Sequence, residues 1–441
     1  MRYGSLPSVR FGLVACLFGL AAQAQQLPPG YGAAPALPAP KRDWLPTVNW
    51  SVATEPWREG QTPKAATALQ VVAFARGLKH PRWLHVLPNG DVLVAEAATE
   101  PEASWSPRAI IQDMVQRRSG AIVENANRIS LLRDKDGDGV AEERFVLLDG
   151  LRQPFGMALI GERLYVANTD SVVSFAYRTG DTRIAEKEEK LLDLRVGHHW
   201  TRALLASRDG SKLYVTVGSG SNIAERGLEL ERGRATILEL DIASRRSRIF
   251  ASGLRNANGM AFEPTTGQLW TVVNERDELG DDVPPDYLTS VKDGGFYGWP
   301  YSYWGKNVDH RVKPPRPDLV ATAITPDYAL GAHTASLGLA YYAGSALPAP
   351  FRDGMFVGQH GSWNRSQYSG YKVIFVPFKD GRPAGEPIDV LTGFLKDDNS
   401  GIAHGRPVGV AIDSQGALLV ADDTGNAIWR VSAARRQATP N

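Results

Sequence analysis

Short runs of apolar, β-branched and aromatic residues alternate with Gly, Asn and Asp from Leu69 to about Ser432. Runs of this kind, bounded by turn-forming residues, are typical of β-strands joined by tight turns. Helical spacing of apolar residues is scarce, and one segment, residues 104–117, predicts a short helix within a loop. The pattern therefore predicts a nearly all-β chain.

An internal repeat organises these strands. In each copy an apolar strand leads through a polar turn into a second strand of the Leu-Tyr-Val type, and the copies start near Pro81, Pro154, Arg202, Asn258, Leu337 and Val408. They recur roughly every 45–80 residues, the range of propeller blades with variable loops. Blades bury both apolar faces by stacking radially, whereas an open solenoid would need capping repeats. We therefore predict an all-β fold, a six-bladed β-propeller with four antiparallel strands per blade.

The N-terminal part has a different texture. A short apolar run over residues 11–22, with arginines before it and small residues after it, predicts a signal peptide over residues 1–24. A short membrane anchor and a lipoprotein attached at Cys16 are the alternatives. Residues 25–68 are rich in Pro and Ala and predict a tether or loosely packed arm. The propeller, as the catalytic domain, then spans residues 69–435.

Composition narrows the class of protein. Lys and Arg total 49 against 48 Asp and Glu, so nothing in the net charge indicates nucleic acid or an anionic membrane as a partner. The only cysteine, Cys16, lies inside the predicted signal. A mature chain without cysteine excludes disulfides, thiol catalysis and Cys-ligated metals, and suits the periplasm or another secreted location. The apolar run is too short for stable membrane insertion.

Polar residues that directly precede or follow the inner strands are the candidates for chemistry, because those strands converge on the centre of a propeller. His198 and His199 precede the third copy, where a histidine is placed to act as a general base. A structural histidine bonded to a carbonyl is the alternative. Arg255, Asn256 and Asn258 lead into the fourth copy and offer hydrogen bonds to a planar polar ligand. Capping between blades is the alternative for the two Asn.

Three further segments carry charge. Residues 274–282 contain five acidic residues after the fourth copy and suit calcium, with a solvated acidic loop as the alternative. Arg406 adds a cation before the sixth copy, although a lone arginine is more often a surface residue. Residues 134–139 match the first half of an EF-hand loop, but Phe145 stands at its twelfth position. A weak calcium site and a plain turn both stay open there.

Taken in order, these segments resemble the glucose/sorbosone dehydrogenase family of propeller enzymes that depend on pyrroloquinoline quinone (PQQ). The L-sorbosone dehydrogenase-like branch is the most similar, and soluble aldose sugar dehydrogenases are further relatives. The strongest matches are residues 254–262 and residues 294–300, the GG-aromatic-YGWP signature. The resemblance implies PQQ- and calcium-dependent oxidation of an aldose or a sugar-derived aldehyde such as sorbosone. It also implies an electron acceptor, a periplasmic cytochrome or a quinone.

The resemblance assigns roles to individual residues. His199 would take the proton from the C1 hydroxyl, with His198 as the neighbouring alternative or a substrate contact, and Arg255 would stabilise negative charge on the quinone oxygen. Glu96 would face the substrate. The cofactor-binding set would be Asn256, Asn258 and Arg406 with Lys372 or Arg365. Calcium, which polarises the quinone carbonyl, would be held largely by main-chain carbonyls in the set Glu275, Arg276 and Asp277.

Two departures from the family pattern concern the site. The family has Gly-Asp after the third blade's second strand, where the Asp orients the catalytic histidine, and this chain has Gly218-Ser219. The usual sequence after the fourth blade is replaced by residues 274–277. A non-catalytic propeller that binds carbohydrate or protein and a calcium-dependent lactonase-like hydrolase are the competing functions. Clustered Arg, Asn and His suit a trianionic quinone better than the metal site of a hydrolase.

Overall fold

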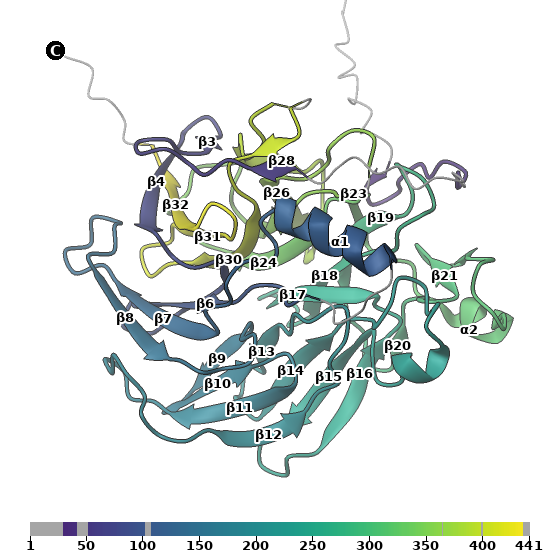
Figure 1. Ribbon diagram of the computed structural model, residues 1–441, viewed down its shortest axis with the longest axis horizontal. Coiled ribbons are helices and arrows are strands. Elements are labelled where there is room, and N and C mark those ends of the chain that lie inside the picture. The colour runs from purple at the N-terminus through teal and green to yellow at the C-terminus, as the bar shows by residue number, and fades with distance from the viewer. Residues whose placement is uncertain (1–29, 42–51, 102–106, 364, 398–399, 435–441) are drawn as a thin grey trace, which may run out of the picture.

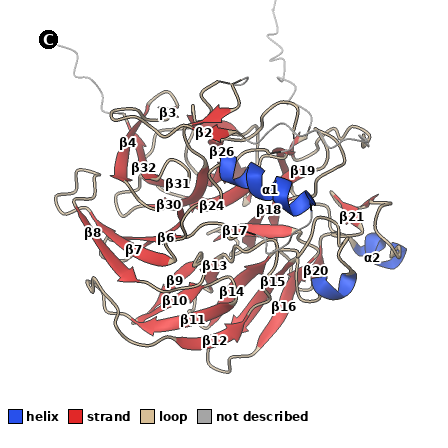
Figure 2. Cartoon of the chain, in the orientation of Figure 1, coloured by secondary structure: helices blue, strands red, loops and turns tan. Residues whose placement is uncertain are grey.

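The structure is a computed structural model that describes residues 30–41, 52–101, 107–363, 365–397 and 400–434. The predicted signal peptide, residues 1–24, lies outside the described residues. Sheets of antiparallel strands are arranged around a common axis (Figure 1). Almost all regular structure is strand, and the helices lie in connections between strands (Figure 2).

Six blades form the ring, and each is described from its inner to its outer strand. The first three are β5 (Pro81–Val86), β6 (Val92–Glu96), β7 (Arg128–Arg133) and β8 (Glu143–Leu148); β9 (Met157–Ile160), β10 (Arg163–Ala167), β11 (Ser171–Ala176) and β12 (Glu189–Asp193); and β13 (Leu204–Ala206), β14 (Lys212–Val217), β15 (Thr236–Asp241) and β16 (Ser247–Ser252). The last three are β17 (Asn256–Phe262), β18 (Leu269–Asn274), β19 (Pro285–Ser290) and β23 (Tyr328–Ala332); β24 (Ser336–Tyr342), β25 (Gly354–Gln359), β26 (Lys372–Lys379) and β28 (Ile388–Thr392); and β30 (Pro407–Ile412), β31 (Leu418–Asp422), β32 (Ala427–Ala433) and β4 (Leu69–Arg76).

The predicted six-bladed propeller is confirmed, and each of the six repeat copies forms the first two strands of one blade. The short helix predicted in a loop is α1 (Pro107–Arg118), between β6 and β7. Other connections carry α2 (Pro317–Thr322), the 3-10 helix η1 (Leu228–Glu231) and the short strands β20 (Gly295–Phe296), β21 (Ser302–Tyr303), β22 (Asn307–Val308), β27 (Arg382–Pro383) and β29 (Ile402–Ala403). Among the described helices, none combines the length and apolar character that crossing a bilayer would require.

The ring is closed by strands from the two ends of the propeller. β4, which precedes the first blade in sequence, pairs antiparallel with β32 and becomes the outer strand of the sixth blade. The pairing runs from Leu69 opposite Ala433 to Arg76 opposite Ala427. Backbone hydrogen bonds therefore join the first and last strands of the propeller, so opening the ring would expose a long unpaired strand edge.

The segment before β4 is more closely attached than a tether or loose arm. Its short strands β1 (Tyr31–Gly32), β2 (Ala53–Thr54) and β3 (Lys64–Ala65) pair with β23, β29 and β28 respectively. Trp57 donates a hydrogen bond to Asp422 (2.8 Å) and packs edge-on against Trp429. Two-residue strands leave no periodic signal in the sequence, which explains why the segment looked unstructured.

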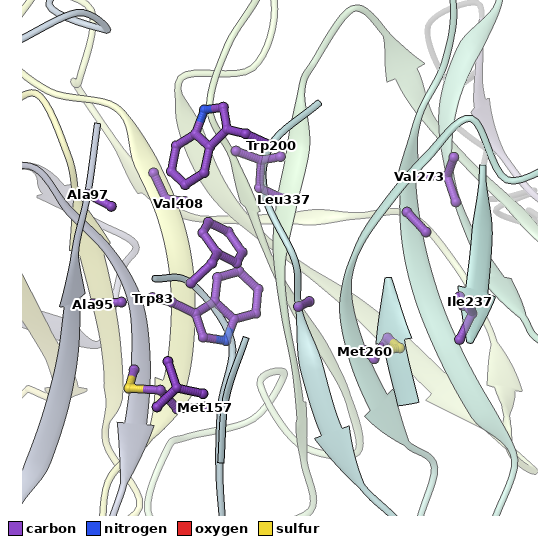
Figure 3. Packing of buried hydrophobic residues seen from close by; sticks show 14 of the residues in the cluster. Trp83, Ala95, Ala97, Met157, Trp200, Ile237, Met260, Val273, Leu337 and Val408 are labelled. Atoms are coloured by element: carbon purple, nitrogen blue, oxygen red, sulfur yellow. The ribbon is translucent and has the colours of Figure 1, made fainter. Parts of the chain in front are cut away.

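The core lies between the blades. Near the axis, aromatic side chains from the first three blades meet. The ring centroids of Trp83 and Phe155 are 4.6 Å apart, and those of Phe155 and Trp200 are 5.9 Å apart. Figure 3 shows Trp83 and Trp200 with Leu337 and Val408 in this cluster. Inner strands approach one another so closely that a Cβ at Gly259 would lie 2.5 Å from the backbone nitrogen of Leu339. Glycine within the inner strands is therefore a packing requirement of the ring.

Candidate active site

One face of the ring collects the segments singled out in the sequence. In each blade the first strand begins and the second strand ends at this face, because the two strands are antiparallel and joined by a turn at the opposite face. The leads into β13, β17 and β30 and the segment after β18 therefore gather around the axis. The β6–β7 connection carries α1 on the same face.

His199 lies in the lead into β13 and is anchored through one ring nitrogen. Its Nδ1 is 2.9 Å from the carbonyl oxygen of Ser219 and 3.0 Å from the Ser219 hydroxyl oxygen. Burial, together with the nearby Arg255 and His198, holds the pKa of His199 well below its usual range, so the ring is neutral near pH 7. A neutral imidazole held by Nδ1 is arranged to accept a proton at Nε2.

Gly218 allows this arrangement. A Cβ at this position would lie 2.4 Å from Oδ1 of Asn256 and 2.7 Å from Cβ of His199. Any other residue would therefore separate the predicted base from the predicted cofactor-binding amide. His198, in contrast, is exposed, and its ring centroid lies 4.9 Å from that of His199. A substrate contact by His198 stays a prediction.

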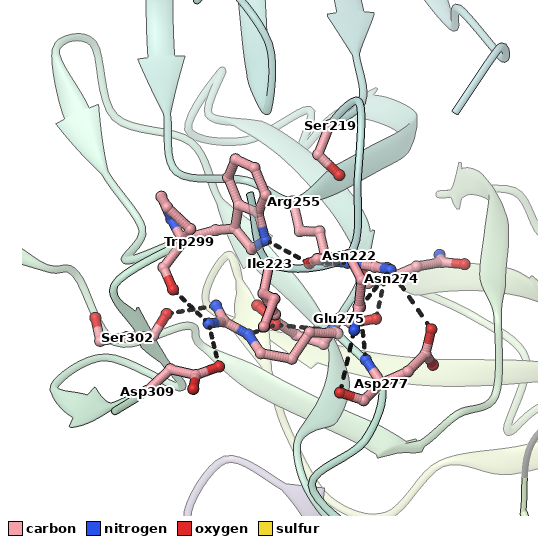
Figure 4. Close-up of polar contacts among 12 residues, drawn as sticks. Ser219, Asn222, Ile223, Arg255, Asn274, Glu275, Asp277, Trp299, Ser302 and Asp309 are labelled. Carbon is pink, nitrogen blue, oxygen red and sulfur yellow. Dashed lines mark hydrogen bonds and ion pairs between the residues drawn. The ribbon is translucent and has the colours of Figure 1, made fainter. Parts of the chain in front are cut away.

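Arg255 is buried and held rigidly on three sides (Figure 4). Its guanidinium donates to the carbonyl oxygen (3.2 Å) and to Oδ1 (3.0 Å) of Asn222, and to the carbonyl oxygen of Glu275 (2.7 Å). The carboxylate of Asp277 lies 3.6 Å away. A preorganised guanidinium next to a neutral histidine is suited to stabilise developing negative charge.

The GG-aromatic-YGWP signature helps to hold Arg255 in place through Asn222. Trp299, inside this signature, donates from Nε1 to the carbonyl oxygen of Asn222 (3.0 Å), the residue that holds Arg255. Asn222 also accepts a bond from the backbone N–H of Asp277 (2.9 Å). Sequence reasoning missed Asn222, because it lies 33 residues before Arg255 and its own neighbours carry no motif.

The two predicted cofactor-binding Asn have different surroundings. Asn258 accepts a hydrogen bond from the Thr201 hydroxyl (3.0 Å) and donates to the backbone oxygen of Asn256 (3.3 Å), so it links the lead into β13 with β17. These contacts agree with the capping alternative, and the assignment of Asn258 to the cofactor stays a prediction. Asn256 differs, since its Oδ1 is buried and makes no hydrogen bond with the described residues.

Two side chains of the predicted calcium set, Glu275 and Arg276, pair with each other in the interior. Arg276 is completely buried and ion-pairs with Glu275 (3.1 Å) and Asp309 (3.2 Å). It also donates to the carbonyl oxygens of Pro300 (2.7 Å) and Ser302 (2.6 Å). The Arg276 side chain therefore fastens the signature loop to the fourth blade. For a metal, this pair offers its backbone oxygens and the second carboxylate oxygen of Glu275, which makes no hydrogen bond with the described residues.

The oxygen atoms next to Arg255 come from main-chain carbonyls, from the side-chain amide of Asn222 and from the carboxylate of Asp277. The Glu275 carbonyl oxygen accepts a bond from Arg255 and keeps a second lone pair. The Asp277 carboxylate lies between Arg255 (3.6 Å) and Nδ1 of His333 (3.4 Å). Carbonyl and carboxylate oxygens are the donors that calcium prefers, so this set fits the ion through backbone oxygens and Asp277.

Glu96 does not face the substrate, which corrects the prediction for this residue. Its carboxylate is completely buried and accepts two hydrogen bonds from Arg128 (2.8 and 3.0 Å). It also accepts bonds from the hydroxyl of Ser130 and the backbone N–H of Lys79. With four donors on two oxygens, Glu96 ties β6 to β7 and to the preceding loop.

A buried charge cluster lies around Asp423 on the same face. Asp423 follows β31 and contacts Arg82, His360 (2.7 Å) and His80 (3.4 Å). Although burial opposes it, His360, His80 and Arg82 hold the pKa of Asp423 well below its usual range. Arg406 completes the cluster by donating to the carbonyl oxygen of His360 (2.9 Å). Blades one and six thus each contribute an arginine to this cluster, and blade five contributes His360.

Lys372 and Arg365 form ion pairs outside this cluster, and their assignment to the cofactor stays a prediction. Lys372 starts β26 and ion-pairs with Asp389 of the outer strand β28 (2.7 Å). Arg365 donates to the carbonyl oxygen of Asp281 (2.9 Å) and to the carboxylate of Asp282 (2.6 Å). Arg82, at the start of β5, is the cation that contacts Asp423 directly.

The position of Arg82 and Asp423 in the repeat was the sequence signal that could have identified them. Arg82 follows a proline at the first inner strand as Val408 does at the sixth, and Asp423 follows the sixth blade's second strand as Glu275 follows the fourth's.

The acidic loop after β7 lies at the opposite face. There the carboxylates of Asp134, Asp136, Asp138 and Glu142 offer oxygens within 4.8 Å of one another.

Comparison with known proteins places the chain. The family model described as TrAA12-like matches residues 63–286 and 320–434, which is more than half of the chain. The chain belongs to the TrAA12-like family. The resemblance to PQQ-dependent sugar dehydrogenases seen in the sequence is thereby confirmed.

Curated relatives are distant. The chain is 28% identical over 308 residues to an uncharacterized protein of Borreliella burgdorferi, which covers 65% of this chain and 77% of that one. It is 25% identical over 329 residues to the pyrroloquinoline quinone-dependent pyranose dehydrogenase of Coprinopsis cinerea, with 61% of this chain covered. The match spans 44% of the fungal protein, so the chain corresponds to less than half of that relative.

Solved structures share the fold. The holo form of the PQQ domain of the Coprinopsis cinerea pyranose dehydrogenase superposes with a TM-score of 0.69 at 21% identity, over 86% of this chain and 98% of that one. A calcium structure of the Trichoderma reesei family AA12 enzyme gives a TM-score of 0.69 at 19% identity, over 88% and 98% of the two chains. At these identities the likeness concerns the fold alone.

Proposed function

We propose that this chain oxidises an aldose or a sugar-derived aldehyde, such as sorbosone, by passing a hydride to PQQ in the presence of calcium. The observation that carries the proposal is the pairing of the neutral, Nδ1-anchored His199 with the buried, preorganised Arg255 at the axis of the ring. The names of the fungal and bacterial relatives support the same chemistry.

The residues around the axis fit an anionic planar cofactor. Three buried atoms on Arg82 or on residues next to Arg255 and Asp423 make no hydrogen bond with the described part of the chain: Asn256 Oδ1, Arg82 Nε and Thr424 Oγ1. Buried polar atoms without partners are rare in proteins, so these three favour a polar ligand. Arg82, Arg255 and Arg406 would hold the carboxylates and the quinone oxygens of PQQ. Calcium would bind at the backbone oxygens of residues 275 and 276 and at Asp277.

Bound PQQ supplies the two-electron acceptor, and calcium supplies a Lewis acid that polarises the quinone. The protein's own residues do the rest. His199 would accept the C1 hydroxyl proton at Nε2 as C1 gives up a hydride, so that the sugar loses two electrons and two protons in all, one proton to His199 and one within the hydride. Arg255 stabilises the negative charge that develops as the hydride departs. Asn222 and Trp299 keep that guanidinium in place.

Export to the periplasm or the cell exterior and electron transfer to a cytochrome or quinone are part of the proposal. The N-terminal pattern and the absence of cysteine after residue 24 support the location.

The test is reconstitution of the purified mature protein with PQQ and calcium, followed by dye reduction over a panel of aldoses and sorbosone. We expect activity that requires both additions and disappears on chelation of calcium. His199→Ala should lower kcat by about 10²–10⁴ while PQQ binding, followed by absorbance, persists. The exposed neighbour gives the matched control, because His198→Ala should retain most activity.

Two outcomes would change the assignment. Loss of activity in His360→Ala with activity retained in His199→Ala would move the base to the His360–Asp423 pair. Failure of PQQ to bind at micromolar concentration would leave a propeller that only binds carbohydrate or protein. Turnover of lactones without PQQ would favour the hydrolase.

A further inference from the structure

Ser219 presents two oxygen atoms to one nitrogen of His199. Its carbonyl oxygen lies 2.9 Å and its hydroxyl oxygen 3.0 Å from Nδ1. The hydroxyl proton is used elsewhere, because Oγ donates to the carbonyl oxygen of Ser221 (2.7 Å). Both atoms facing Nδ1 are therefore acceptors, and a lone pair on Nδ1 would meet the lone pairs of the carbonyl oxygen. The proton of the neutral ring must lie on Nδ1.

The other charged groups around His199 do not replace this contact. Arg255 approaches from the lead into β17, and His198 and Arg202 belong to the same segment as His199. All three disfavour a positive charge on the ring. Glu231 of η1 stands behind the loop, where it accepts bonds from the backbone N–H of Gly220 and the hydroxyl of Ser221. No carboxylate among the described residues forms a hydrogen bond with the imidazole.

We propose that Ser219 is the positioning residue of His199, whose Nδ1–H tautomer it fixes through a carbonyl oxygen so that the Nε2 lone pair is free for the substrate. The inference rests on the proposed function, in which His199 is the base. It gives Ser219 the role that the sequence resemblance assigns to an Asp, but with a neutral acceptor. Ser219 is completely buried, so water cannot take its place.

The neutral acceptor has a measurable consequence. A carboxylate beside Nδ1 stabilises the imidazolium and raises the pKa of a histidine, whereas a carbonyl oxygen does so much less. With Ser219 the base stays deprotonated, and therefore competent, to a lower pH than it would with Asp. An Asp side chain at this position is one atom longer than Ser and reaches Nδ1, since Oγ is already at 3.0 Å.

The experiment compares the full mature chain with Ser219→Asp and with Ser219→Asn, which has the same shape without the charge. Long-range ¹H–¹⁵N spectra of histidine-labelled protein without added PQQ identify the tautomer and the pKa of each ring, and His199→Gln assigns the signal. We expect the Nδ1–H form in the wild type. Ser219→Asp should raise the pKa of His199 by about one unit or more, and Ser219→Asn should leave it close to the wild-type value.

The pH profile of kcat/KM in the reconstituted enzyme should follow, with its acid limb moved to higher pH in Ser219→Asp alone. An Nε2–H tautomer in the wild type, or an unchanged pKa in folded Ser219→Asp, would overturn the inference. If Ser219→Asp does not fold, the wild-type tautomer decides. If the wild type has the Nδ1–H tautomer but no PQQ-dependent activity, the proposed function is refuted and the positioning role of Ser219 stands. If it has PQQ-dependent activity but the Nε2–H tautomer, the positioning role is refuted and the proposed function stands.

Discussion

Replacing Arg276 by Met tests whether this residue fastens the signature loop to the fourth blade instead of serving a metal. Met has a similar length but carries no charge and no donor. In the structure the guanidinium pairs with Glu275 and Asp309 and donates to two carbonyl oxygens at 2.6 and 2.7 Å. Asp309 keeps its bonds to Arg311 (2.7 and 2.9 Å), whereas Glu275 loses its charged partner and keeps only the backbone N–H of residue 276 (3.1 Å).

The magnitude follows from that imbalance. Removing one member of a buried ion pair costs about 3–5 kcal/mol, because the remaining charge is left without compensation. Among the described residues, the other carboxylate oxygen of Glu275 is buried and makes no hydrogen bond, so no second cation compensates this charge. For a chain of 441 residues the entropy of unfolding is about 0.9 kcal/mol per kelvin, so Arg276→Met should lower the midpoint by about 3–5 °C.

Thermal unfolding followed by circular dichroism measures the shift. The matched control is Arg232→Met, which breaks an exposed ion pair with Glu229 (2.9 Å) and should leave the midpoint unchanged. The double variant Glu275→Gln with Arg276→Met should recover part of the loss, since no buried charge remains. A midpoint for Arg276→Met within 1 °C of the control would refute the reasoning.

Three further results are expected. Glu96→Gln should destabilise the fold by about 2 kcal/mol in urea unfolding, because it weakens a buried ion pair, and an altered KM with normal stability would contradict the structural role. Asn256→Ala should weaken PQQ binding without moving the midpoint, whereas Asn258→Ala should lower the midpoint; equal effects would show that the two amides do not differ. Burial lowers the pKa of His80 to about 4, so from pH 6.5 to 4 the unfolded chain binds a proton that the folded chain does not. The free energy of unfolding should therefore fall by up to about 1.4 kcal/mol for each unit of decreasing pH, and His80→Gln should reduce this slope in urea titrations.

The sequence by itself determined the architecture and the position of some of the candidate site residues. Alternating strands with polar turns, repeated six times, leave few folds other than a closed propeller, because each blade must cover two apolar faces. The same repeat located Arg255, Asn256 and His199, because residues that lead into an inner strand lie near the axis. These inferences needed only local pattern and repeat position.

Tertiary structure decided which way the remaining polar side chains point. Glu96 ends a second strand as Asn274 does, yet it turns into its own blade because Arg128 and Ser130 on the next strand satisfy it. Asp423 gathers Arg82 and His360 across sequence distances of 341 and 63 residues. Such pairings depend on which blades become neighbours when the ring closes.

The N-terminal segment shows the same limit. Trp57 and the two-residue strands β1 and β3 have no stable partner in the local sequence, and they acquire one only when the blade edges and Asp422 are already in place. A repeat encodes its own strands through short-range periodicity. Contacts between distant segments depend on burial and on the partners available in the folded ring, and neither can be inferred from the local sequence pattern.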